Sequence, residues 1–254
     1  KIAFLTNNLS YFDIDLIDAV TGKKIKKLIK GSRSLDFEEL KFLQPGISWS
    51  PDSKKIVFAA KSGSGDALYI VDIESEQKEK IPFELDGVFS ATWSPQGDKL
   101  AFVGYEKGAS DIYIYDINKK THFNLTKDIY SDSEPSWSPD GSSIAFVSDR
   151  DDAVKKSIST AQDMISVDYE SKDIYVINIE TENLKQITST GYNEDYPVFA
   201  NTEKSLFYIA DSSGTWNLFK YDLASGSTSV VTNLLTGIFQ LSINKYDDAM
   251  VFSG

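Results

Sequence analysis

Apolar and aromatic residues fall in short runs that recur at a fixed distance along this chain. A Trp-Ser-Pro motif begins at Trp49, Trp93 and Trp137, so successive copies are 44 residues apart. Each copy leads through a turn into a short apolar run. Weaker copies without the tryptophan follow around Phe199 and Ile243, again 44 residues apart. A fixed period of this length is typical of repeat architectures.

Each repeat holds four short runs of β-branched and aromatic residues, separated by Gly, Asp, Asn and Ser. In the second repeat we expect strands around Trp49 and over residues 55–60, 67–73 and 78–82. The proline of each motif fixes φ at the first corner of a type I turn, which favours a hairpin between the first two strands. The pattern predicts an all-β fold: a β-propeller of four-stranded antiparallel blades.

The repeats divide the chain into blades of one propeller domain. The expected blade units are residues 1–30, 45–84, 89–127, 133–190, 195–234 and 239–254. The first unit holds three strands and the last holds two, which favours six blades in the parent protein. The chain begins without methionine and stops within an apolar run, so we expect it to be excised from a longer chain.

Aromatic residues recur at two positions of the repeat, and we expect both to lie in the core between blades. One position is the tryptophan of the motif. The other, on the third strand, is occupied by Tyr69, Tyr113, Tyr175 and Phe219. Asp15 stands at the second position in the first blade, and the sequence gives no reason for this exception.

Two segments interrupt the period. Residues 31–44 lengthen the connection into the second blade, and within them 34–40 are predicted to form a short helix. Residues 150–172 are a longer insertion between two strands of the fourth blade, and they carry Asp163 and Asp168 among a few apolar residues. We expect this insertion to form a lid or docking element whose removal leaves the propeller folded.

Composition excludes several classes of function. Lys and Arg number 26 against 38 Asp and Glu, a net charge of −12, so electrostatic binding of nucleic acid is not expected. The chain has no cysteine, which excludes disulfides and thiolate chemistry. The single histidine, His122, is expected to be an exposed residue of an outer strand. No apolar run approaches the roughly 18 residues that cross a bilayer, so membrane insertion is not expected.

Most of the negative charge falls on one face of the predicted blades, which we call the acidic face. It is formed by the connections between the second and third strands of a blade and by those leading to the next blade. Clustered carboxylates there would attract a cation or a basic peptide. The candidate ligands for a cation are Asp128, Asp132, Glu134, Asp149, Asp151 and Asp152.

These oxygen ligands suit calcium, although their spacing matches no calcium-binding loop and a solvated acidic rim is the alternative. Candidate contacts for a partner are Glu194, Asp195, Asp163, Asp168 and Trp216. No other cofactor and no catalytic residue are predicted.

The Trp-Ser-Pro-Asp-Gly motif at 137–141, followed by Ser148-Asp149-Arg150 and Asp173-Ile174-Tyr175, resembles the TolB-type β-propeller repeat. Related repeats occur in the propellers of dipeptidyl and prolyl oligopeptidases and of tricorn protease. Residues 60–69 and 234–240 resemble, more narrowly, the propeller region of large secreted bacterial metallopeptidase-like proteins. The repeats after residue 190 lack Ser-Pro-Asp, which puts their turns in question.

The resemblance implies a non-catalytic, protein-binding, scaffolding or access-gating propeller of an exported bacterial protein, located in the periplasm or outside the cell. Its partner would be a protein or peptide, or another domain of the same chain. No position matches a peptidase catalytic motif, so no such residue is carried over.

The alternative is a propeller glycosidase or lyase that uses carboxylates of the acidic face, because such pairs have no short motif. It requires two carboxylates roughly 5–10 Å apart, one with a raised pKa, together with aromatic platforms for a sugar. Trp216 is the sole tryptophan expected near that face. The sequence therefore favours the binding module.

Overall fold

The computed structural model describes residues 1–8, 11–31, 39–40, 46–62, 65–150, 171–202 and 204–253. All regular secondary structure in these ranges is β-strand. The described residues contain no helix of the length and apolar character that a membrane span requires. The chain divides into two compact units, Lys1–Asn124 and Leu125–Gly254. The grouping of all blades into one domain stays a prediction.

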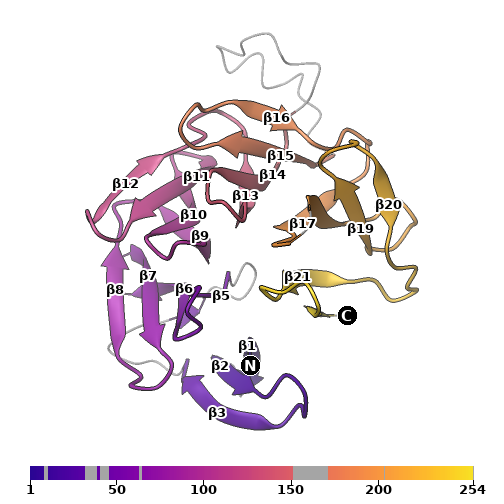
Figure 1. Cartoon of the computed structure of the whole chain (residues 1–254). Coiled ribbons are helices and arrows are strands. Elements are labelled where there is room, and N and C mark those ends of the chain that lie inside the picture. Colours follow the sequence, from indigo (N-terminus) through magenta and orange to yellow (C-terminus); the bar gives the residue numbers. More distant parts are fainter. Residues whose placement is uncertain are drawn as a thin grey trace. The chain divides into compact units, whose positions relative to one another are not determined.

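The first unit contains three antiparallel sheets (Figure 1). The first consists of β1 (Ile2–Asn8), β2 (Tyr11–Ile17) and β3 (Lys24–Ile29). The second contains β4 (Glu39–Leu40), β5 (Ser48–Trp49), β6 (Lys55–Ser62), β7 (Gly65–Asp72) and β8 (Lys78–Pro82). The third consists of β9 (Gly87–Trp93), β10 (Lys99–Glu106), β11 (Ala109–Asp116) and β12 (Thr121–Asn124).

The second unit also contains three antiparallel sheets. The first consists of β13 (Asp132–Trp137), β14 (Ser143–Ser148), β15 (Asp173–Asn178) and β16 (Leu184–Gln186). The next consists of β17 (Glu194–Phe199), β18 (Ser205–Ala210), β19 (Asn217–Asp222) and β20 (Thr228–Val230). The last consists of β21 (Phe239–Ile243) and β22 (Met250–Ser253). Chain-order pairing of four strands is the blade arrangement, so the predicted fold class is confirmed.

The prediction of a helix over residues 34–40 is wrong at its end, where Glu39–Leu40 form strand β4. β4 pairs with Lys61 and Ala60, and β5 pairs with Val57 and Ile56. Both short strands therefore run along the same edge of β6, and the first strand of this blade comes in two pieces. Pairing with β6 satisfies the backbone groups of β4, which overrides local helix propensity. Residues 34–38 lie outside the described residues.

Stacked aromatic pairs join the second and third strands of four blades. The ring centroids are 5.8 Å apart for Phe58 and Tyr69, and 6.1 Å apart for Phe146 and Tyr175. Equivalent pairs are Phe102 with Tyr113 and Tyr208 with Phe219. All eight side chains are buried, as are Trp93 and Trp137. Trp49 is partly buried and packs against the same core. The prediction that the repeated aromatic residues lie in the core is therefore confirmed, fully for the buried rings and in part for Trp49. Their packing is a main source of the stability of these four blades.

The structure explains why Asp15 stands at an aromatic position. The strand register places Phe4 opposite Asp15, just as it places Phe58 opposite Tyr69. Asp15 is only 6% exposed, and its carboxylate forms an ion pair with Lys24 from β3. Burial of a carboxylate is tolerated when a cation and hydrogen bonds accompany it. The lysine therefore allows a charge where the other blades have a ring.

The turns between the third and fourth strands of the blades share one pattern of side-chain to backbone hydrogen bonds. In each, a carboxylate or amide oxygen at the start of the turn accepts hydrogen bonds from the two backbone N–H groups two and three residues later. The residues that do this are Asp18, Asp72, Asp116, Asn178 and Asp222. Side-chain acceptors of this kind fix the turn and hence the register of both strands.

Replacing Asp222 with alanine should lower the urea concentration at the midpoint of unfolding. The substitution removes the acceptor for the N–H groups of Ala224 and Ser225, which lie 3.0 and 2.7 Å from Asp222 Oδ1. Urea denaturation of both proteins measures the difference. Asp222→Asn keeps an acceptor oxygen and serves as the control. Equal stability of the alanine and asparagine variants would contradict this role.

Candidate functional site

The loops of the acidic face can be followed in detail in the second unit. There they comprise residues 128–134, 149–150, 171–172, 187–196 and 211–216, which we call the acidic end. Ser148, the last residue of β14, pairs with Asp173, the first residue of β15. The insertion between them therefore leaves from the acidic end, as predicted. Its residues 151–170 lie outside the described residues, and so do the candidates Asp151, Asp152, Asp163 and Asp168. The lid or docking role of this insertion stays a prediction.

Arg150 forms the centre of a buried ion cluster at the acidic end. Its guanidinium contacts the carboxylates of Asp132 and Asp128 and lies 2.6 Å from Ser148 Oγ. Arg150 is 7% exposed and Asp132 is fully buried, whereas Asp128 is partly exposed. Burial opposes the charge on Arg150, but the two aspartates outweigh it and raise the pKa of the guanidinium. The arginine is therefore permanently charged.

Aromatic rings fix the guanidinium in this position. Its central carbon lies 5.1 Å from the ring centroid of Phe146 and 5.3 Å from that of Tyr130. Tyr175 contributes a third ring at 5.7 Å, and its hydroxyl donates a hydrogen bond of 2.7 Å to the Arg150 carbonyl oxygen. A desolvated cation over aromatic faces is stabilised by the ring quadrupoles. The aromatic core of the blade thus continues directly into the ion cluster.

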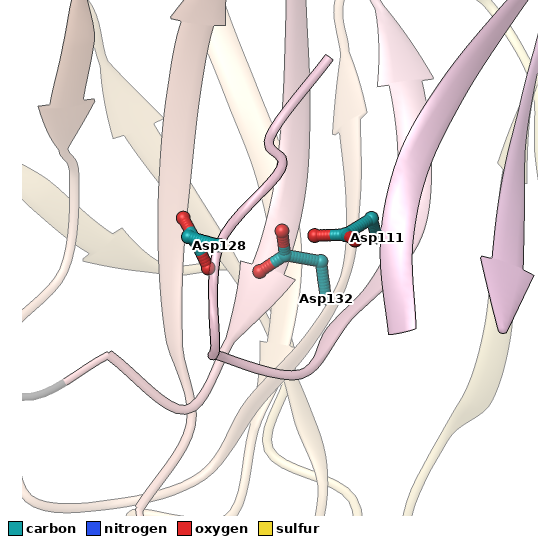
Figure 2. A group of neighbouring side chains, drawn as sticks. All are labelled: Asp111, Asp128 and Asp132. Carbon is teal, nitrogen blue, oxygen red and sulfur yellow. The ribbon is translucent and has the colours of Figure 1, made fainter. Parts of the chain in front are cut away.

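Of the described residues predicted to bind calcium, Asp128 and Asp132 lie close together, whereas Glu134 and Asp149 contact other groups. Oxygens of Asp128 and Asp132 lie within 4.8 Å of one another, and Figure 2 shows both side chains. Asp111, also drawn there, belongs to the first unit, where its Oδ2 accepts a hydrogen bond of 2.8 Å from Asn124. Asp149 Oδ1 accepts a hydrogen bond of 2.7 Å from the backbone N–H of Ser131. Calcium at this group stays a prediction, and Arg150 already supplies positive charge there.

The first strand of each blade in the second unit carries a bulge. The pairing shifts register near Glu134 in β13, Tyr196 in β17 and Gln240 in β21. These residues have φ values of 54°, 53° and 58°, in the left-handed region that side chains other than glycine rarely adopt. They occupy the same position of the repeat. Bulges re-aim side chains and are common next to functional sites.

Glu134 is held by the neighbouring blade rather than grouped with Asp132. Its Oε2 accepts a hydrogen bond of 2.6 Å from the backbone N–H of Tyr196, which joins the bulge of β13 to that of β17. Burial, reinforced by the nearby charge of Asp195, raises the pKa of Glu134 to about 8. Burial also raises the pKa of Asp195, and the exposed Lys172 opposes that shift. Two interacting acids of the first strands therefore lie near one lysine, which precedes the third strand β15.

Glu194, predicted to contact a partner, is instead buried. It is 1% exposed, and its Oε1 accepts a hydrogen bond from the Thr190 hydroxyl. Its Oε2 has no hydrogen-bond donor within the described ranges. Asp173, 8% exposed, lies within hydrogen-bonding reach of Glu194, and the pKa of each is raised by burial. A direct contact between Glu194 and a partner would require this segment to move.

The other predicted residues are placed as follows. Asp195 is half-buried and remains available at the acidic end. Trp216 is also half-buried, and its carbonyl accepts a hydrogen bond of 2.8 Å from the Ile238 N–H. His122 lies on the exposed strand β12, as predicted, with its ring 5.2 Å from that of Phe83.

The last hairpin keeps its turn without Ser-Pro-Asp, through the hydrogen bond from Asp247 N–H to Asn244 O.

The sequence reasoning missed three residues of this site. Arg150 was noted only within the repeat motif, and neither Asp173 nor Tyr196 was a candidate. A finer comparison of the repeats would have found two of them. Asp173 recurs as Asp111 and Asn217 at the start of the third strand, and Tyr196 occupies the bulge position of Glu134 and Gln240.

Comparison with known proteins gives a family match. Residues 32–155 match the model described as TolB beta propeller domain. This match confirms the TolB-type repeat that the Trp-Ser-Pro motifs indicate. The narrower resemblance to secreted metallopeptidase-like proteins stays a prediction. No curated protein matches the chain significantly.

Solved structures show the same fold. TolB from Acinetobacter baumannii aligns over 98% of this chain with a TM-score of 0.75 and 20% identity, and the chain spans 56% of that protein. The tricorn protease aligns over 98% with a TM-score of 0.64 and 16% identity, and 27% of it is covered. An oligogalacturonate lyase in complex with manganese aligns over 98% with a TM-score of 0.62 and 12% identity, and 65% of it is covered. Identities this low establish the propeller fold alone.

Proposed function

We propose that this chain, built from TolB-type propeller repeats, is a non-catalytic module that binds a protein, a peptide or another domain of its own chain through the acidic end. The observation that carries the proposal is the hydrogen bond from the Tyr196 N–H to Glu134. Through this hydrogen bond the Glu134 carboxylate joins β13 to β17 of the next blade. The carboxylates of Asp128 and Asp132 are likewise occupied, by their ion pairs with Arg150.

Groups with such fixed partners are poor proton donors and acceptors for a substrate, but they hold the loops of the acidic end in a fixed arrangement. Asp195 and Asp211 are half-buried at the acidic end, and the charges of Asp211 and of the exposed Lys172 both act on Asp195. A partner with lysine or arginine side chains would be complementary to this charge. A scaffolding or gating role in an exported bacterial protein, in the periplasm or outside the cell, follows from the TolB-type resemblance and is part of the proposal.

A fluorescent peptide rich in lysine and arginine should bind the purified chain at low salt. Asp195→Asn and Asp211→Asn should each weaken this binding about threefold or more, because each removes one charge from the acidic end. Fluorescence anisotropy measures the affinity. Glu180→Gln, an exposed acid in the turn between β15 and β16 at the opposite end, is the matched control. Equal weakening by the control, or binding of an acidic peptide as tight as that of the basic one, would contradict the proposal.

One observation favours the alternative of a glycosidase or lyase. Glu134, whose pKa is raised to about 8, interacts with a second carboxylate, Asp195, and paired carboxylates with shifted pKa values are what such enzymes require. The test is turnover of glycans, oligogalacturonate included, by the purified chain. Turnover that Glu134→Gln abolishes would replace the binding proposal with the enzymatic one.

A further inference from the structure

Asp132 and Glu194 occupy equivalent places in two successive blades. Asp132 begins β13 and pairs with Ser148, while Glu194 begins β17 and pairs with Ala210. They are 0% and 1% exposed. Each blade therefore buries a carboxylate at the first residue of its first strand. A buried carboxylate is costly unless a cation or proton compensates its charge.

The two blades differ in how that charge is compensated. In the first blade Arg150 follows Asp149, and in the second Ser212 follows Asp211. Asp149 and Asp211 are placed alike, because each accepts a hydrogen bond from the equivalent loop, at 2.7 and 3.1 Å. Serine thus stands where the preceding blade has its arginine. Within the described part of the chain, no lysine or arginine forms an ion pair with Glu194.

Three neighbours of Glu194 present side-chain oxygen atoms, namely Asp173, Thr188 and Thr190. Asp173 Oδ1 lies 3.5 Å from the Thr188 hydroxyl, and the Thr190 hydroxyl contacts Glu194 Oε1. The unsatisfied Glu194 Oε2 lies in this group. Thr190 is exposed, so the two carboxylates lie just beneath the surface and within reach of a small ion.

We propose that Glu194 and Asp173 bind a divalent cation, with calcium preferred, and that the hydroxyls of Thr188 and Thr190 complete the protein side of the site. Carboxylate and hydroxyl oxygens in irregular geometry suit calcium better than magnesium, which demands a regular octahedron. The cation supplies the positive charge that Arg150 supplies in the preceding blade. The site lies within the acidic end, but its buried carboxylates differ from Asp195 and Asp211, the half-buried acids through which the proposed function is tested.

Calorimetric titration of the purified chain with calcium chloride at pH 8 tests the site, and sensitised terbium luminescence gives a second readout, because Tyr208 lies near Glu194. Calcium at about a hundredfold excess over its Kd should raise the Tm by roughly 5 °C or more. Glu194→Gln and Asp173→Asn keep the side-chain shapes and should each weaken calcium binding at least tenfold.

Two controls keep the outcome decisive. Asp149→Asn alters the acidic residues around Arg150, in the preceding blade of the same unit, and should leave the calcium affinity unchanged. Glu180→Gln should also leave it unchanged. Absence of binding by the wild-type chain at 10 mM calcium (an order of magnitude above weak extracellular sites) would overturn the proposal and leave a shared proton as the compensation. Loss of binding in Asp149→Asn but not in Glu194→Gln would overturn it by placing the ion at Asp128 and Asp132.

Discussion

Replacing Arg150 with methionine will lower the free energy of unfolding by about 3–5 kcal/mol, the cost of leaving a buried carboxylate without its partner. Asp132 is fully buried, and Arg150 is its cation in the described part of the chain. Methionine retains the apolar contact with Phe146 and Tyr175 but provides no charge. Urea denaturation followed by tryptophan fluorescence, to which Trp137 of the same blade contributes, measures the loss.

The double variant Arg150→Met, Asp132→Asn separates charge from packing. Removing the orphaned carboxylate should restore about 1–2 kcal/mol of the loss, because a buried amide costs less than a buried charge. Arg150→Lys keeps the charge but not the fork that reaches both aspartates, so it should fall between the wild type and methionine. A cost below about 1 kcal/mol for Arg150→Met would show that the ion cluster does not stabilise the fold.

Raising the pH from 5 to 9 should destabilise the wild-type chain by about 4 kcal/mol more than the Glu134→Gln variant. Burial first, and then Asp195, raise the pKa of Glu134 from 4.5 to about 8. Between these pH values the folded protein holds a proton that the unfolded chain has released. The stabilisation is therefore complete at low pH and is lost as the pH rises towards 8.

Urea denaturation at unit pH intervals measures both curves. Glutamine retains the oxygen that accepts the Tyr196 N–H but does not titrate, so its curve should lack the Glu134 contribution while the rest of the pH dependence remains. Glu182→Gln, an exposed acid in the turn between β15 and β16, should follow the wild type. Parallel curves for wild type and Glu134→Gln would show that Glu134 titrates normally.

The blades themselves follow from the sequence, because their determinants are local and repeated. Strand order, hairpin turns and the aromatic pairs depend on period-two patterning and turn residues that recur every 44 residues, so errors at one copy are corrected by the others. The prediction of β8 over residues 78–82 agrees with the structure to the residue. The segment 34–40, for which a helix was predicted, occurs once in the chain, so no second copy could correct the local signal.

The repeated pattern is enough to predict the propeller fold and the end of the blade from which the 150–172 insertion leaves. The roles of the acids at that end depend on the tertiary structure. Asp132 meets Arg150 across 18 residues, and Glu134 meets the N–H of Tyr196 across 62. Such pairings depend on strand register and on backbone bulges that set the direction of each side chain, and charge alone specifies neither. Glu194 and Asp195 are adjacent acids in the sequence, but Glu194 is 1% exposed and Asp195 is half-buried, because successive residues of a strand point to opposite faces of the sheet.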